Sequence, residues 1–256
     1  MELSREQVVE HYNRWAPMME NVPDFYKWVL YVLAKERISK KARIADIGCG
    51  TGALLRLLGE AGYTNLTGVD FSPECLDIFG RQAQPVSLYL HDIETGPLRE
   101  PSDVVLMTGV VDFLATPDVA LSNVRASLAD NGYLLLTIRN RLAYFPWYHL
   151  RYLSRFLAFS PRLAHWFLWL TTPLGMRRSD QPFERVYAPS QMRRMLRTGG
   201  FRVRREYGSE ILPMLWIPDL APAIGCMRRL DLVVRELPPL PLCFRYMFVC
   251  QKVPDV

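Results

Sequence analysis

The chain has 256 residues, half of them apolar, and a formal net charge of +5. This length is sufficient for one domain with its own core and an insertion. The charge is too small to favour nucleic acid as a partner, and no apolar run reaches the roughly 18 residues that predict a membrane span. The five cysteines are scattered without metal-ligand spacing, and the first residues are polar. We therefore expect reduced thiols, no metal site, no signal peptide and a cytoplasmic protein.

The first elements in chain order are helices. Ser4 with Gln7 three residues later matches a capping box, which predicts a helix at the start of the chain. A second helix is expected from about residue 24 to 37. The short apolar run 44–47 then has the composition of a buried parallel strand.

Three glycines at alternate positions, Gly48, Gly50 and Gly52, follow this strand, and a helical pattern of leucines comes next. Glycine allows a tight turn and a close approach of the backbone to a ligand. The N-terminus of a helix attracts phosphate or carboxylate groups. Strand, glycine turn and helix together predict the start of a doubly wound α/β fold that binds a nucleotide.

Alternating strands and helices continue to residue 140, as this fold requires. The pattern predicts strands at 65–70, 86–90, 102–107 and 133–139, with helices beginning at Ser72-Pro73 and spanning 116–129. The tripeptide 130–132, Asp-Asn-Gly, is expected to end the second of these helices. Residues 185–190 are expected to lead into a helix that ends at about residue 198. The pattern then predicts a strand at 202–207, a helix at 227–237 and a last strand at 244–251.

Two cofactors are compatible with the glycine turn. Gly48, Gly50 and Ala53 match the dinucleotide pattern G-x-G-x-x-A, and Asp70 follows at the distance expected for an acid that binds ribose. This interpretation favours NAD. The stretch 46–52, Asp-Ile-Gly-Cys-Gly-Thr-Gly, also resembles motif I of the class I S-adenosylmethionine-dependent methyltransferases. A glycine turn without a ligand is the third alternative.

Other segments resemble the same family. The stretch 68–74, G-V-D-F-S-P-E, is similar to its G-x-D-x-S motif, and 103–114 is similar to the segment that passes the methionine part of the cofactor. Residues 10–16 resemble the Y-D-x-W-A segment that folds over the cofactor in small-molecule methyltransferases, with Asn13 in place of the usual Asp. In that family Tyr12 would lie near the sulfonium, and an aromatic face attracts a cation.

The resemblance implies a seven-stranded Rossmann-like sheet whose last strand is antiparallel, with S-adenosylmethionine as cofactor. Asp46 and the glycine turn would hold the methionine end, Asp70 the ribose and Asp92 the adenine. The full set of implied cofactor-binding residues is Tyr12, Asp46, Gly48, Cys49, Gly50, Gly52, Asp70, Phe71, Ser72, His91, Asp92, Ile93, Thr108, Gly109 and Val110.

Residues 140–179 contain no acid and combine arginines with many aromatic side chains. The spacing of Tyr148, Tyr152, Phe156 and Phe159 predicts one apolar helical face. We expect a helical lid insertion at 140–185, between a core at 1–139 with N-terminal cap helices and a C-terminal part of the sheet at 186–256. The insertion fits a packed cap, the wall of a pocket for an apolar acceptor, or a helix pair on anionic lipid.

The predicted function is methyl transfer to a small, apolar acceptor, with oxygen favoured as the methylated atom and a natural product as the type of substrate. An oxygen acceptor needs a nearby base, and the candidates are His11, Tyr12, Asp112 and His149. The alternatives are a lipid or quinone methyltransferase at a membrane surface and a family member that binds the cofactor but catalyses another reaction, such as a cyclisation. The acceptor and the oligomeric state are left open.

Overall fold

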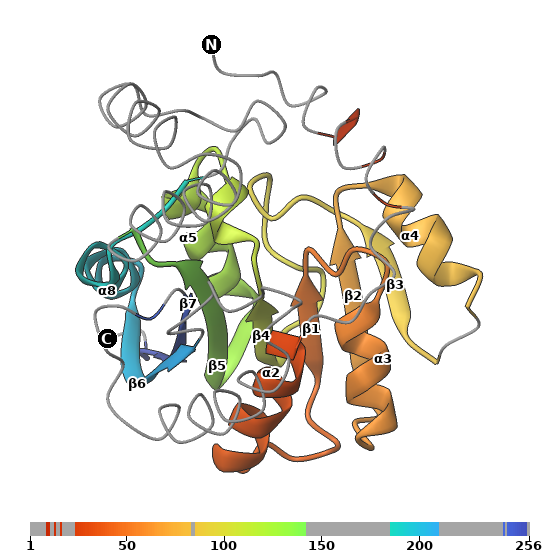
Figure 1. The fold of residues 1–256 in the computed structure, drawn as a ribbon, viewed down its shortest axis with the longest axis horizontal. Coiled ribbons are helices and arrows are strands. Elements are labelled where there is room, and N and C mark those ends of the chain that lie inside the picture. The colour runs from red at the N-terminus through yellow and green to blue at the C-terminus, as the bar shows by residue number, and fades with distance from the viewer. Residues whose placement is uncertain are drawn as a thin grey trace, which may run out of the picture.

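The computed structural model describes residues 9, 10, 13, 16, 24–82, 85–141, 185–209, 243 and 245–254. In this part of the chain seven strands form one twisted sheet in the order β3-β2-β1-β4-β5-β7-β6 (Figure 1). The strands are β1 (Ile44–Ile47), β2 (Leu66–Asp70), β3 (Ser87–Leu90), β4 (Ser102–Met107), β5 (Leu128–Arg139), β6 (Phe201–Ser209) and β7 (Arg245–Lys252). The helices are α2 (Asp24–Lys35), α3 (Ala53–Glu60), α4 (Pro73–Gly80), α5 (Pro117–Ser127) and α8 (Pro189–Thr198), with a short 3₁₀ turn, η2 (Val111–Phe113).

The sheet is parallel from β3 to β5, and β7 is antiparallel to both of its neighbours. The strand order reverses between β1 and β4, because the chain first moves outward through β2 and β3 and then returns to the other side of β1. In open α/β sheets, ligands bind at the carboxyl ends of the strands beside such a reversal. This topology confirms the predicted doubly wound sheet with an antiparallel last strand.

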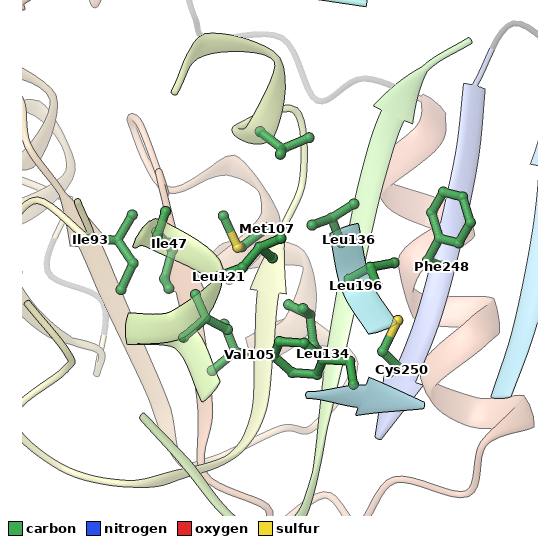
Figure 2. Packing of buried hydrophobic residues seen from close by; sticks show 14 of the residues in the cluster. Ile47, Ile93, Val105, Met107, Leu121, Leu134, Leu136, Leu196, Phe248 and Cys250 are labelled. Carbon is green, nitrogen blue, oxygen red and sulfur yellow. The ribbon is translucent and has the colours of Figure 1, made fainter. Parts of the chain in front are cut away.

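Two apolar cores cover the two faces of the sheet, because successive side chains of a strand point to opposite faces. On one face Trp28 of α2, Leu54 of α3 and Phe79 of α4 pack against the sheet. On the other face Leu121 of α5 and Leu196 of α8 pack against alternate residues of β4, β5 and β7 (Figure 2). Burial of a leucine or phenylalanine side chain stabilises a fold by about 1.5–3 kcal/mol. The helices are therefore fixed to the sheet, and the loops at its edge are held in place.

The junction between α5 and β5 differs from the prediction. The helix ends at Ser127 and the strand begins at Leu128, five residues before the expected start. The cause is a pairing that the sequence does not reveal: Leu128 lies opposite Ser102 in the sheet, with a register shift before Tyr133 pairs with Val104. Asn131 has a φ of 60° and lies within the strand at this irregularity.

Several predicted segments lie outside the described residues. These are the first helix at Ser4, almost all of the lid insertion at 140–185, and the helix at 227–237. The division of the chain at residues 139 and 185 stays a prediction. Within the described ranges, no helix combines the length and the apolar character that crossing a membrane requires.

The two ends of the insertion meet at the carboxyl edge of the sheet. Asn140 and Tyr187 form a parallel bridge, and the backbone N–H of Arg141 donates to the carbonyl of Tyr187 at 3.0 Å. Asn140 is fully buried, and its Nδ2 donates to the carbonyl of Cys243 just before β7 at 2.8 Å. The chain thus leaves the sheet and returns to it at neighbouring points.

Candidate cofactor and acceptor site

The glycine turn after β1 has the strained geometry that the sequence predicts. Gly48, Gly50 and Gly52 have φ values of 70°, 52° and 79°, a region that other residues rarely adopt. The backbone N–H groups of Gly48 and Cys49 both donate to the carbonyl of Val69, at 2.7 and 3.1 Å, so the turn is attached to the end of β2.

There is no room for a side chain at the first and third of these glycines. A Cβ on Gly48 would come within 2.5 Å of Val110 Cγ2, and one on Gly52 would come within 2.4 Å of the Phe79 ring. The turn is therefore enclosed between the loop after β4 and the helix α4. The N-terminus of α3 begins directly after it, at Ala53.

Asp46 lies on β1 immediately before the turn and is 2% exposed. Its Oδ1 has no hydrogen-bond partner among the described residues. Burial, and then the neighbouring charge of Asp70, raise the pKa of this carboxyl well above its ordinary value. A buried carboxylate with an unpaired oxygen is suited to receive a cation, and the ammonium group of S-adenosylmethionine fits that requirement.

Asp70 ends β2 and organises the loops on both sides. Its Oδ2 accepts a hydrogen bond from the backbone N–H of Gly50 at 2.8 Å, and its Oδ1 accepts one from Ser72 at 2.9 Å. The backbone N–H of Phe71 also hydrogen-bonds to this carboxylate, so three N–H groups hold it. The side chain of Ser72 caps α4 by accepting from the N–H of Cys75 at 3.2 Å. Phe71 is half-buried between these two residues in the sequence.

The N-terminal segment reaches this edge of the sheet. Ser72 Oγ donates to Asn13 Oδ1 at 2.5 Å. This contact brings Asn13 to the G-x-D-x-S motif. Tyr12 itself lies outside the described residues. Asn13, noted in the sequence only as a departure from the family pattern, is thus the residue that connects the two motifs.

The loop after β3 holds three of the predicted residues, His91, Asp92 and Ile93. Asp92 is half-buried, and its Oδ1 accepts from the N–H of Glu94 at 2.8 Å. His91 Nε2 lies 2.9 Å from the carbonyl of Gly96. The side chain of Ile93 lies in the core, and its carbonyl accepts from Asn123 Nδ2 at 2.7 Å. Of the three predicted residues here, Asp92 is the one that carries a carboxylate.

Beyond β4 the chain turns past the glycine turn toward β5. Thr108 is 8% exposed, and the N–H of Gly109 donates to Thr137 Oγ1 of β5 at 2.8 Å. Val110 closes against Gly48. These contacts place the predicted residues Thr108, Gly109 and Val110 beside the glycine turn.

Asp112 follows in η2 and is 1% exposed. Its Oδ2 lies 3.3 Å from Arg139 Nε, and its backbone carbonyl accepts from the N–H of Arg185 at 2.7 Å. Burial raises the pKa of Asp112 to about 6, against the opposing effect of the Arg139 and Arg245 charges. Asp112 is the one predicted base within the described residues, since His11, Tyr12 and His149 lie outside them.

Two residues near the site were not predicted from the sequence. Arg139 pairs with Asp112 across 27 positions, and Tyr26 of α2 lies close enough to Asp46 for that charge to raise its pKa, after the larger effect of burial. The helical pattern of residues 24–35 predicts which side of the helix is buried. It does not show that this side meets Asp46 on β1. Within the described ranges no group of three or more His, Cys, Asp or Glu side chains could hold a metal ion.

Comparison with known proteins gives a consistent result. Residues 18–206 match a family described as a methyltransferase domain. The chain is 28% identical over 189 residues to a ubiquinone biosynthesis O-methyltransferase of Maricaulis maris, covering 71% of this chain and 67% of that protein. It is 23% identical over 138 residues to a malonyl-[acyl-carrier protein] O-methyltransferase of Anoxybacillus flavithermus, covering 53% of each.

The fold is shared with solved structures. One is the magnesium protoporphyrin IX methyltransferase of Synechocystis with bound S-adenosylhomocysteine, at a TM-score of 0.55 and 14% identity. The superposition covers 98% of this chain and 89% of that one.

Proposed function

The chain belongs to the S-adenosylmethionine-dependent methyltransferase family, and we propose that it methylates an oxygen atom of a small, apolar acceptor. The observation that carries the proposal is the buried carboxylate of Asp46, whose Oδ1 has no hydrogen-bond partner among the described residues, beside a glycine turn that has no space for side chains at Gly48 and Gly52. The family membership decides between the two cofactors that the turn allows, in favour of S-adenosylmethionine. Both relatives are O-methyltransferases, which supports oxygen as the methylated atom.

When bound, S-adenosylmethionine supplies an electrophilic methyl group on a positively charged sulfur. In the proposed site Oδ1 of Asp46 accepts hydrogen bonds from the ammonium group. Asp70, which Gly50 and Ser72 hold at the end of β2, binds the ribose hydroxyls. Asp92 binds the adenine amino group, and Thr108, Gly109 and Val110 line the methionine part. The role of these residues is to orient the two reactants and exclude water.

The acceptor is proposed to be apolar because of the composition of residues 140–179 in the sequence. Arginines among aromatic side chains, with no acid, suit a wall around a hydrophobic molecule and equally a contact with anionic lipid. A contact with anionic lipid, together with the similarity to a ubiquinone biosynthesis O-methyltransferase, favours a quinone or lipid acceptor at a membrane surface as the second candidate.

The first experiment is calorimetric titration with S-adenosylhomocysteine, with NADH as a parallel control. We expect micromolar affinity for S-adenosylhomocysteine and none for NADH. Binding of NADH alone, or of neither compound, would contradict the proposed function.

The second experiment measures S-adenosylhomocysteine release with catechol-type acceptors of short and long alkyl tail, with and without anionic vesicles. Turnover of short-tailed acceptors in solution supports the small-molecule function. Turnover that requires both the long tail and the vesicles supports the membrane-surface function. Tight cofactor binding without release on any acceptor would indicate another reaction, such as a cyclisation.

A further inference from the structure

Two buried carboxylates at the carboxyl edge of the sheet each have one unpaired oxygen. Among the described residues, the buried side-chain atoms without a hydrogen-bond partner are Trp28 Nε1, Asp46 Oδ1, Tyr63 OH and Asp112 Oδ1. The proposed cofactor site uses the oxygen of Asp46. An unpaired buried carboxylate oxygen is destabilising unless a ligand pairs with it, and the oxygen of Asp112 has no such assignment.

Asp112 lies between the glycine turn and the ends of the insertion. It follows by two positions Val110, which closes against Gly48. On its other side the carbonyl of Asp112 binds the N–H of Arg185, and the hydroxyl of Tyr187 donates to the carbonyl of Val111 at 3.5 Å. Asp112 is therefore near the glycine turn and also near the point where the chain returns from residues 140–185.

Two arginines and one tyrosine interact electrostatically with Asp112. Arg139 of β5 binds its Oδ2, and its guanidinium also lies over the Phe113 ring at 5.2 Å from the ring centre. Arg245, at the start of β7, acts on Asp112 at longer range, and Tyr187, before α8, interacts with it electrostatically. Burial would push the pKa of this carboxyl far upward, and the two arginines hold it at about 6. A base is most effective when its pKa lies close to the working pH.

We propose that Asp112 is a catalytic residue: its Oδ1 accepts a hydrogen bond from a neutral hydroxyl of the acceptor and takes that proton during methyl transfer. This inference rests on the proposed function and names its substrate class. The hydroxyl oxygen forms a bond to the methyl carbon while the bond between that carbon and sulfur breaks. The bonding pair remains on sulfur, and the proton ends on Asp112.

The arrangement selects hydroxyl acceptors over carboxylate acceptors. A carboxylate brings no proton for Oδ1 to accept and would be repelled by it in a buried site. Arg139 is a positioning residue, because its bond to Oδ2 leaves Oδ1 as the oxygen that can turn to the acceptor. Since Oδ1 is covered in this structure, the acceptor must displace the atoms over it as it binds, and the reacting groups are then shielded from water.

The experiment compares two ring compounds, catechol and benzoate, as probes of the protein saturated with S-adenosylhomocysteine. Calorimetry is done on the wild type, on Asp112→Asn, and on Asp118→Asn as a matched control at an exposed acid of α5. We expect catechol to bind the wild type at least tenfold more tightly than Asp112→Asn, and benzoate to bind Asp112→Asn more tightly than the wild type. Asp118→Asn should resemble the wild type with both probes.

A second readout follows the carboxyl carbon of Asp112 by ¹³C NMR, with Asp112→Asn used to assign the signal. We expect it to titrate near pH 6 and to titrate at lower pH when catechol is bound. Equal catechol affinity of the wild type and Asp112→Asn, or no binding to the wild type, would overturn the inference. Failure of the proposed function would instead appear as a lack of S-adenosylhomocysteine binding. The titration of Asp112 in the free protein does not depend on that binding, so the two failures can be distinguished.

Discussion

The carboxylate of Asp70 fixes the glycine turn that precedes it by twenty residues, because its Oδ2 accepts the backbone N–H of Gly50 at 2.8 Å. Its Oδ1 holds the N–H of Ser72, the residue that caps α4. One side chain thus connects the turn before α3 to the start of α4. Asp70 therefore has a structural part in the cofactor site in addition to the ribose contact proposed for it.

The first prediction concerns Asp70→Asn. An amide nitrogen cannot accept a hydrogen bond, so at least one of the backbone N–H groups that the carboxylate holds loses its partner. Hydrogen bonds to charged groups contribute about 1.5–3 kcal/mol. We expect S-adenosylhomocysteine affinity to fall at least tenfold, measured by calorimetry. Asp77→Asn changes an exposed acid on α4 and serves as the control. Unchanged affinity in Asp70→Asn would show that the turn keeps its shape without this carboxylate.

The second prediction compares two glycines seven residues apart. Gly52→Ala places a Cβ against the Phe79 ring at a φ of 79°, whereas Gly59→Ala places one in open space within α3. Left-handed geometry costs an alanine roughly 1–2 kcal/mol, and the clash adds about 1–3 kcal/mol. We expect Gly52→Ala to abolish cofactor binding and lower the melting temperature. Gly59→Ala should bind normally and gain about 0.5–1 kcal/mol in stability; similar behaviour of the two variants would contradict the enclosed geometry of the turn.

Much of the fold could be predicted because its signals are local. Strand 44–47, the glycine turn and the Ser72-Pro73 helix start each depend on residues close together in the sequence, and the structure has all three. The pairing of Leu128 with Ser102 is not local. The Asn131-Gly132 pair resembles a helix stop, so the sequence places the end of α5 too late by two residues and the start of β5 too late by five.

The candidate site was predictable to a different extent. Motifs assign Asp46, Asp70 and the glycines, because short spacing fixes their relation to one strand or turn. The arginines that interact with Asp112 come from β5 and β7, which are distant from it in the sequence. The sequence alone does not show which acid each of these arginines meets. Periodicity shows which face of a strand a residue occupies but not which polar group it meets across the sheet edge.

The third prediction is a pH dependence of cofactor binding. Burial raises the pKa of Asp46 well above its ordinary value, and the ammonium group binds the ionised form. Affinity should therefore rise as the pH increases toward the pKa of Asp46, with one proton released for each ligand bound below it. Calorimetry in buffers of different ionisation enthalpy measures the proton count. Asp46→Asn should bind weakly at all pH values, and a wild-type affinity independent of pH between 5 and about 8 would contradict this assignment.

The fourth prediction separates the two roles of Ser72. Its hydroxyl caps α4 and binds Asn13. Ser72→Ala should lose about 1 kcal/mol of unfolding free energy from the missing cap, and its cofactor affinity should also fall. Asn13→Ala should reduce the affinity while leaving the cap and most of the stability intact. Denaturant unfolding and calorimetry on both variants test this; an Asn13→Ala variant with wild-type affinity would show that the N-terminal segment does not contribute to binding through this contact.

The fifth prediction concerns stability around Asp112, whose folded-state pKa of about 6 lies above the ordinary value of 3.8. Between these two pH values the folded protein binds more protons at Asp112 than the unfolded chain does. Protonation of Asp112 therefore stabilises the folded state fully below pH 4, and this stabilisation is lost as the pH rises to about 6. The shift of about two units corresponds to roughly 3 kcal/mol. The Asp112→Asn variant has no carboxyl to titrate at this position. Its asparagine is a weaker partner for Arg139 than a carboxylate, and this loss changes the unfolding free energy by the same amount at each pH.

The unfolding free energy of Asp112→Asn minus that of the wild type should therefore rise by roughly 3 kcal/mol between pH 4 and pH 7. Urea unfolding at several pH values measures this difference, and contributions of the other acids cancel in it. Asp118→Asn, at an exposed position of α5, should show a nearly constant difference. A constant difference for Asp112→Asn would mean that the arginines around Asp112 cancel the effect of its burial, so that the carboxyl titrates as in the unfolded chain.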